Sequence, residues 1–95
     1  MDKESITAIV EQLRFSKNAL EIKDGHFIDS IFIDQDYDKE GNKVYGVSIR
    51  YSSDVTCGTL ALLAFLEDQV GKKCLWYRLS PKVLFVYCLG VRLGG

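Results

Sequence analysis

The segment Val83–Leu89 constrains the fold more than any other part of this 95-residue chain. In an extended strand its side chains are apolar on both faces: Val83, Phe85 and Tyr87 against Leu84, Val86 and Cys88. A strand with one face in water alternates apolar and polar residues, whereas a strand without that alternation is covered on both faces. We therefore expect a sheet in which Val83–Leu89 is an interior strand.

Two helices are expected to accompany this sheet. In Lys3–Phe15 apolar residues recur at helical spacing along one stripe, namely Ile6, Ile9, Val10 and Leu13. The second helix, Cys57–Val70, is apolar almost all round. Such a helix is usually buried on more than one side, so we expect it between the sheet and the first helix. Gly71 follows it, and glycine commonly ends a helix.

The strands are expected to be joined by turns and one longer loop. Asp24-Gly25 tolerates the positive φ of a tight hairpin turn, and Ser80-Pro81 marks a second turn. The polar stretch Gln35–Lys43 is expected to be a loop. The predicted strands are Ala19–Lys23, His26–Asp34, Val44–Tyr51, Cys74–Leu79 and Val83–Leu89.

Length and element order together predict one domain with an α+β fold. The net charge is −1, and the chain therefore lacks the basic excess of a protein that binds nucleic acid. No secretory signal is visible, and the longest apolar run, Leu60–Leu66, is too short to span a membrane. The cysteines, Cys57, Cys74 and Cys88, share no close spacing, which favours reduced thiols in a cytoplasmic protein.

The sequence predicts neither an enzyme nor a metal or cofactor site. The acidic loop Asp34–Asn42 resembles a calcium loop, but Lys39 and Tyr45 stand where that motif needs glycine and a bidentate glutamate. Cys57 is placed near the start of a helix, where the helix dipole favours a thiolate. A nucleophile also needs a base, and nothing in the sequence places His26, the only histidine, near Cys57.

The chain ends in Val91-Arg92-Leu93-Gly94-Gly95, directly after the predicted interior strand and Gly90. This ending and the element order resemble the β-grasp fold of ubiquitin-like proteins, in which the final central strand runs into a free Gly-Gly. The resemblance implies a β-grasp-like mixed sheet with a crossing helix, here with an extra N-terminal helix. Residues 1–90 would form the domain and residues 91–95 a flexible C-terminal tail. The last strand would lie beside the first strand of the hairpin.

The same resemblance implies a ubiquitin-like protein modifier, or a sulfur carrier that uses the same tail. Gly95 and Gly94 would form the conjugation site, because a narrow enzyme channel admits only backbone without Cβ. Arg92 and Leu93 would offer partner enzymes a charged and an apolar handle. The implied partners are an activating enzyme that uses ATP, a conjugating enzyme and a deconjugating protease, with no nucleic acid and no membrane.

The alternative is a non-enzymatic protein-interaction module. The order α-β-β-β-α-β-β also resembles that of secretion chaperones and of small inhibitor or immunity proteins, which bind through a sheet or helix face. A thiol enzyme that uses Cys57 is a third hypothesis. The C-terminus discriminates between these, because a modifier needs Gly95 to be free and a binding module does not.

Overall fold

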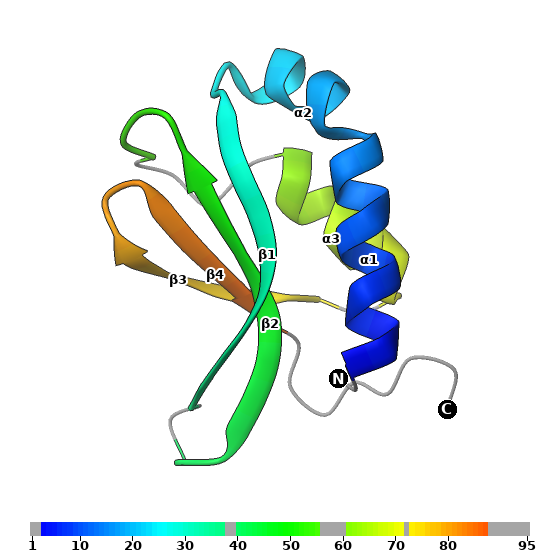
Figure 1. Ribbon diagram of the computed structural model, residues 1–95, viewed down its shortest axis with the longest axis vertical. Coiled ribbons are helices and arrows are strands. Elements are labelled where there is room, and N and C mark those ends of the chain that lie inside the picture. The colour runs from blue at the N-terminus through cyan, green and yellow to red at the C-terminus, as the bar shows by residue number, and fades with distance from the viewer. Residues whose placement is uncertain (1–2, 38–39, 56–60, 72, 88–95) are drawn as a thin grey trace.

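The first part of the chain is helical and leads into a sheet (Figure 1). The computed structural model describes residues 3–37, 40–55, 61–71 and 73–87. In these residues the elements follow the order α1 (Lys3–Phe15), α2 (Lys17–Asp24), β1 (Ile28–Tyr37), β2 (Lys43–Tyr51), α3 (Ala61–Val70), β3 (Leu75–Ser80) and β4 (Val83–Tyr87). The predicted α+β class is therefore confirmed, and α1 has the predicted bounds.

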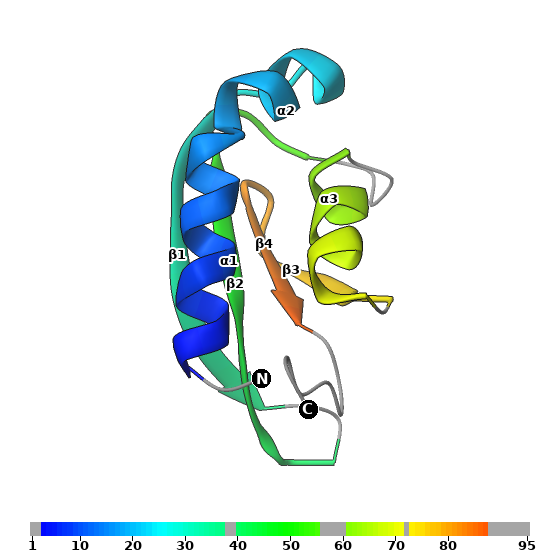
Figure 2. The same ribbon diagram turned by 90° about the vertical axis from the view of Figure 1, so that its right-hand side faces the viewer.

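The main core lies between the sheet and two helices on the same face of it. Figure 2 shows α1 on the side of β1 and β2, with α3 beside it on the side of β3 and β4. The prediction that the second helix lies between the sheet and the first helix is therefore wrong, because α1 contacts β1 and β2 directly. The apolar stripe of α1 is buried, as its spacing predicts, and α1 contacts both β1 and α3. Fully buried residues from all three parts meet there: Ile6, Leu13, Ile49, Leu62 and Leu84.

The described strands form an antiparallel sheet with the order β1-β2-β4-β3. Interior placement of β4 is confirmed, because it pairs with β2 on one side and β3 on the other. The predicted mixed sheet is wrong, and so is the prediction that the last strand lies beside the first strand of the hairpin. α1 covers β1, and the guanidinium of Arg14 donates two hydrogen bonds to the backbone carbonyl of Ile31 in that strand. The open edge of the hairpin is that of β2, and there β4 pairs antiparallel.

Two predictions for the segment before the sheet are corrected by α2. Ala19–Lys23 is helical and not a strand, because Glu21 and Asp24 tie this segment to Ile28 and to the start of α3. Gly25 does adopt a positive φ of 71°, but it ends this helix and does not form a hairpin turn.

The β1–β2 hairpin is longer than the sequence predicts. Residues Gln35–Tyr37 were expected in a loop, but they pair with β2 as far as Tyr37 opposite Lys43. Polar side chains are tolerated there because that end of β1 is largely exposed. β3 begins and ends one residue later than predicted. Residues 57–60 of the predicted second helix and 88–89 of the predicted last strand lie outside the described residues.

Candidate interaction surfaces

The residues that the sequence analysis assigned to a conjugation site lie outside the described part of the chain. They are Arg92, Leu93, Gly94 and Gly95, together with the tail 91–95 as a whole. Cys57, the residue of the thiol-enzyme hypothesis, also lies outside it. Among the described residues there is no cluster of His, Cys, Asp and Glu that could hold a metal ion. Within the same residues, no helix is long and apolar enough to cross a membrane.

Cys74 corrects the prediction of reduced thiols. It is disulfide-bonded and almost fully buried, with 8% of its surface exposed. Cys57 and Cys88 both lie outside the described residues. Sequence spacing indicates disulfides only where cysteines recur in a framework, and it does not show which distant cysteines a fold brings together.

His26 packs at the edge of the core and is not paired for catalysis within the described residues. Its ring meets that of Tyr51 edge to face, with centroids 6.1 Å apart. Its Nδ1 is buried, and no hydrogen-bond partner for that atom is found in the described part of the chain. A general base must lie within hydrogen-bonding reach of the group it deprotonates. In the described part of the chain, the His26 ring is seen packing against Tyr51.

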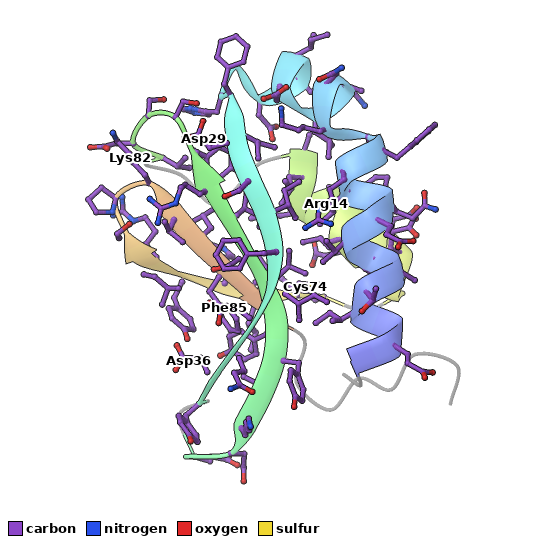
Figure 3. The ribbon with its side chains drawn as sticks, in the orientation of Figure 1. Arg14, Asp29, Asp36, Cys74, Lys82 and Phe85 are labelled. Atoms are coloured by element: carbon purple, nitrogen blue, oxygen red, sulfur yellow. The ribbon has the colours of Figure 1, made fainter. Side chains whose placement is uncertain are left out.

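The sheet face opposite the helices carries a cluster of aromatic rings from β3 and β4. The ring centroids of Tyr77, Phe85 and Tyr87 lie between 5.4 and 6.0 Å apart. Phe85 has no exposed surface, although α1 and α3 lie on the other face. Its ring is close to Gly46, and the Tyr77 hydroxyl donates a hydrogen bond to the carboxylate of Asp36 on β1. Phe85 and Asp36 are labelled in Figure 3. The curled β1–β2 hairpin therefore helps to seal this second, smaller core.

The ionisation of this cluster fits a structural role. Burial, and then the hydrogen bond to Asp36, raise the pKa of Tyr77 far above its usual value. The hydrogen bond from Tyr77, with a second from the backbone N–H of Tyr37, lowers the pKa of Asp36. Tyr77 is thus held as a protonated donor and Asp36 as a charged acceptor.

The largest exposed apolar side chains gather in the segment from the end of α1 to the start of β1. Phe15 is 89% exposed, Ile22 82% and Phe27 72%. Ile22 and Phe27 line a shallow pocket with Asn18, Glu21 and Gly25. We call Ile22 and Phe27, which share this pocket, the α2 surface. Apolar groups exposed together in this way are typical of a surface that binds another protein.

Two buried or half-buried carboxylates hold α2 in place beneath this surface. Glu21 accepts a hydrogen bond of 2.6 Å from the backbone N–H of Ile28 and forms an ion pair with Lys17. Asp24 accepts hydrogen bonds from the backbone N–H groups of Ala61 and Leu62, at 2.6 and 3.4 Å, at the start of α3. α2 is therefore tied both to the sheet and to α3, so Ile22 and Phe27 are presented from a fixed backbone.

The two outer strands of the sheet differ in how their edges are protected. β1 carries Asp29, Asp34 and Asp36 and no basic residue, and Arg14 caps one of its carbonyls (Figure 3). Charge and a blocked carbonyl both discourage a further strand. β3 carries a single charged residue, Arg78, and no side chain of the described residues is hydrogen-bonded to its backbone. Its Leu75, Trp76 and Leu79 are 44%, 39% and 46% exposed.

Sequence reasoning missed both surfaces. The predicted strand Ala19–Lys23 does not place Ile22 on a helix beside Asn18. The spacing of Asn18 and Ile22 at i and i+4 was the signal for a shared helical face. The β3 edge was missed because its exposure depends on which strand lies in the middle of the sheet.

Comparison of the chain with family models, with curated proteins and with solved structures found no match.

Proposed function

We propose that this protein is a non-enzymatic interaction module that binds an apolar segment of another protein on its α2 surface. The observation that carries the proposal is the exposure of Ile22 and Phe27, at 82% and 72%, on both sides of one shallow pocket. Burying such side chains against a partner is favourable by about 25 cal/mol per Å² of apolar surface. Because Glu21 and Asp24 hold the backbone, little ordering is needed on binding.

The charges around this surface favour a protein partner over a membrane or nucleic acid. Lys17 and Lys23 are accompanied by Glu21 and Asp24 in the same helix, so the surface has no net positive field. Anionic lipids and phosphate backbones are both attracted by clusters of basic residues. A shallow apolar pocket beside a helix instead fits the apolar side chains of an amphipathic segment.

Site-specific photocrosslinking tests the proposal. A photoreactive residue in place of Ile22 should capture a discrete partner in cells, whereas the same residue in place of exposed Tyr37, on the β1–β2 hairpin, should not capture it. The partner is then purified and its affinity measured by calorimetry. We expect Ile22→Lys with Phe27→Ser to weaken binding at least roughly tenfold, as for residues at the centre of an interface.

Tyr37→Ser is the matched control, since Tyr37 is also an exposed large side chain, at 66%. It should bind the partner as the unaltered protein does. Equal capture from positions 22 and 37, or unchanged affinity of the double variant with an unchanged melting temperature, would reject the α2 surface as the binding site.

The C-terminal sequence supports a second candidate, the ubiquitin-like modifier. Here the reactive group would be the carboxylate of Gly95, with Gly94 as its neighbour and with Arg92 and Leu93 gripped by partner enzymes. Its partners would be an activating enzyme that uses ATP, a conjugating enzyme and a deconjugating protease. Incubation with a candidate activating enzyme and ATP, followed by mass spectrometry, should reveal an adenylate or thioester at Gly95. Deletion of Gly94 and Gly95 should abolish that product, and a deletion variant that works normally in its host would end this candidacy.

A cytoplasmic location is part of the proposal, and it predicts the redox state of Cys74 in cells. Disulfides are rare in the reducing cytosol and common in oxidising compartments. A cytoplasmic protein should therefore have Cys74 largely reduced in cells, although it is disulfide-bonded in the structure. Rapid acid quenching and alkylation would measure the fraction of free thiol. Complete oxidation in living cells would exclude the cytoplasmic location.

A further inference from the structure

We propose that the edge strand β3 is a self-association site, through which two copies of this chain pair antiparallel about a two-fold axis at Tyr77. β3 pairs on one side only, with β4, so alternate backbone N–H and C=O groups along its other side point outward. In the described residues no strand occupies that side. Another extended strand can pair with all of these outward backbone groups, and β3 of a second copy is such a strand.

The sequence of β3 is complementary to itself in this register. With Tyr77 at the axis, Trp76 lies opposite Arg78 of the second copy, and Leu75 lies opposite its Leu79. The two-fold axis repeats each of these pairings. Opposite residues share one face of a sheet, so the guanidinium meets an indole and a leucine meets a leucine. No like charges are brought together, because Arg78 is the single charged residue of the strand.

The neighbouring structure leaves these side chains accessible. Trp76 pairs with Val86 and Arg78 with Leu84 on the inner side of β3, which fixes both on the face that carries the helices. The guanidinium of Arg78 donates a hydrogen bond of 2.8 Å to the carbonyl of Val55 and is thereby held in position. Arg78 and Leu79 are exposed, and Trp76 is partly exposed. In the β3–β4 register, a bulge between Arg78 and Ser80 leaves Leu79 without a Cα partner on β4.

The opposite edge of the sheet cannot serve in the same way. Two β1 strands would bring three aspartates of one copy, Asp29, Asp34 and Asp36, toward those of the other. The guanidinium of Arg14 also donates a hydrogen bond to a backbone carbonyl of that strand. Since only one edge is competent, association closes at a dimer and does not continue into a filament. The two sheets would then form one continuous antiparallel sheet.

Replacing Trp76 with a positive residue in one variant and with a negative residue in another tests the proposed pairing register of the two β3 strands. Trp76→Lys places a lysine opposite Arg78 of the second copy, and Trp76→Glu places a carboxylate there. Sedimentation equilibrium should show a concentration-dependent dimer for the unaltered chain. We expect the dissociation constant to rise at least roughly tenfold for Trp76→Lys, because two unfavourable pairings are created, and not to rise for Trp76→Glu. A merely apolar contact would be weakened equally by both variants.

A second position guards against a folding defect at Trp76. Leu79→Lys should weaken the dimer, and adding Leu75→Glu should restore it, because these two residues meet across the axis. Melting temperature and circular dichroism identify any variant that is misfolded. Ile22→Lys, on the α2 surface, should leave dimerisation unchanged, so this proposal and the proposed function can fail separately. A chain that stays monomeric at every concentration, assemblies larger than a dimer, or identical behaviour of Trp76→Lys and Trp76→Glu would overturn the proposal.

Discussion

Gly46 is the residue at which the second core depends most directly on the absence of a side chain. A Cβ atom built there would lie 2.4 Å from the carbonyl oxygen of Val86 and 2.6 Å from the ring of Phe85. Glycine thus allows β2 to approach the backbone and ring of β4 closely, and the Phe85 ring is buried as a consequence. The φ of Gly46 is not positive, so the requirement for glycine here is one of space and not of backbone conformation.

We expect Gly46→Ala to lower the free energy of unfolding by about 1–3 kcal/mol, the usual cost of overpacking a close-packed site. The backbone oxygen of Val86 cannot move aside as a flexible side chain could. Urea unfolding at pH 7 measures the change. Ser53→Ala, at an exposed small residue after β2, is the control and should be neutral. An unchanged midpoint for Gly46→Ala would mean that β2 and β4 separate more easily than the contact distances imply.

At the scale of elements, the Tyr77–Asp36 hydrogen bond joins β3 to the far end of β1. These strands occupy opposite edges of the sheet, so the bond links them only because the hairpin curls across the face between them. Asp36 is a stronger acceptor when it is charged, and Tyr77 donates only while it is protonated. The link therefore has a defined pH range.

Stability should fall at both ends of that range. The pKa of Asp36 is lowered from 3.8 on folding, so its contribution is present above about pH 4 and is lost as pH falls through the lower, folded value. The pKa of Tyr77 is raised from 10.0, so its contribution is present below about pH 10 and is lost as pH rises toward the folded value. Tyr77→Phe should flatten both flanks of the stability profile, as measured by urea unfolding at pH 3, 7 and 11. Parallel profiles for the variant and the unaltered protein would assign the pH dependence to other groups.

The contact between α2 and α3 is a second link between elements. The carboxylate of Asp24 accepts hydrogen bonds from backbone N–H groups at the start of α3, where helices lack internal partners. It also places a negative charge near the positive end of the helix dipole. The sequence predicts Asp24 in a hairpin turn and gives no indication of this long-range contact.

Asp24→Ala should destabilise the protein by about 1 kcal/mol, the usual value of a helix cap. Amide hydrogen exchange should quicken at Ala61 and Leu62 more than in the interior strand β4. Asp68→Ala, at an exposed acidic residue near the other end of α3, is the control and should change neither quantity. Equal exchange rates at Ala61 and Leu62 in the variant and the unaltered protein would show that the cap is dispensable.

At the scale of the whole molecule, the Cys74 disulfide makes stability depend on redox conditions. A disulfide restricts the unfolded chain and typically stabilises a small protein by about 2–4 kcal/mol. We expect Cys74→Ser to lower the melting temperature without reductant. With dithiothreitol the variant and the unaltered protein should melt at similar temperatures. A difference that persists in full under reducing conditions would attribute the effect to packing of the buried side chain.

The molecule covers its two sheet faces in different ways, and the two proposed binding surfaces lie elsewhere. α1 and α3 cover one face (Figures 1 and 2). On the other face, Gly46 and Asp36 of the hairpin contact the aromatic rings of β3 and β4. Among the described residues, exposed apolar side chains remain on the α2 surface and along the β3 edge, where partners are proposed to bind. Binding at one need not obstruct binding at the other, because they involve separate elements.

The sequence by itself determined the features that depend on local periodicity. The stripe of Ile6, Ile9, Val10 and Leu13 specifies α1, because residues three and four apart share a helix face. The two-faced apolar run from Val83 specifies an interior strand, because only burial on both sides explains it. The α+β class follows from these patterns.

Tertiary structure decided the features that depend on distant partners. Ala19–Lys23 is short enough to form either a strand or a helix, and its ties through Glu21 and Asp24 to Ile28 and Ala61 favour the helix. The position of β4 beside β2 depends on which hairpin edge is free, and the local pattern of β4 is the same in either arrangement. The closeness of Phe85 to Gly46 likewise depends on residues far apart in the chain. A local pattern records whether a residue is buried, but the fold decides which residues bury it.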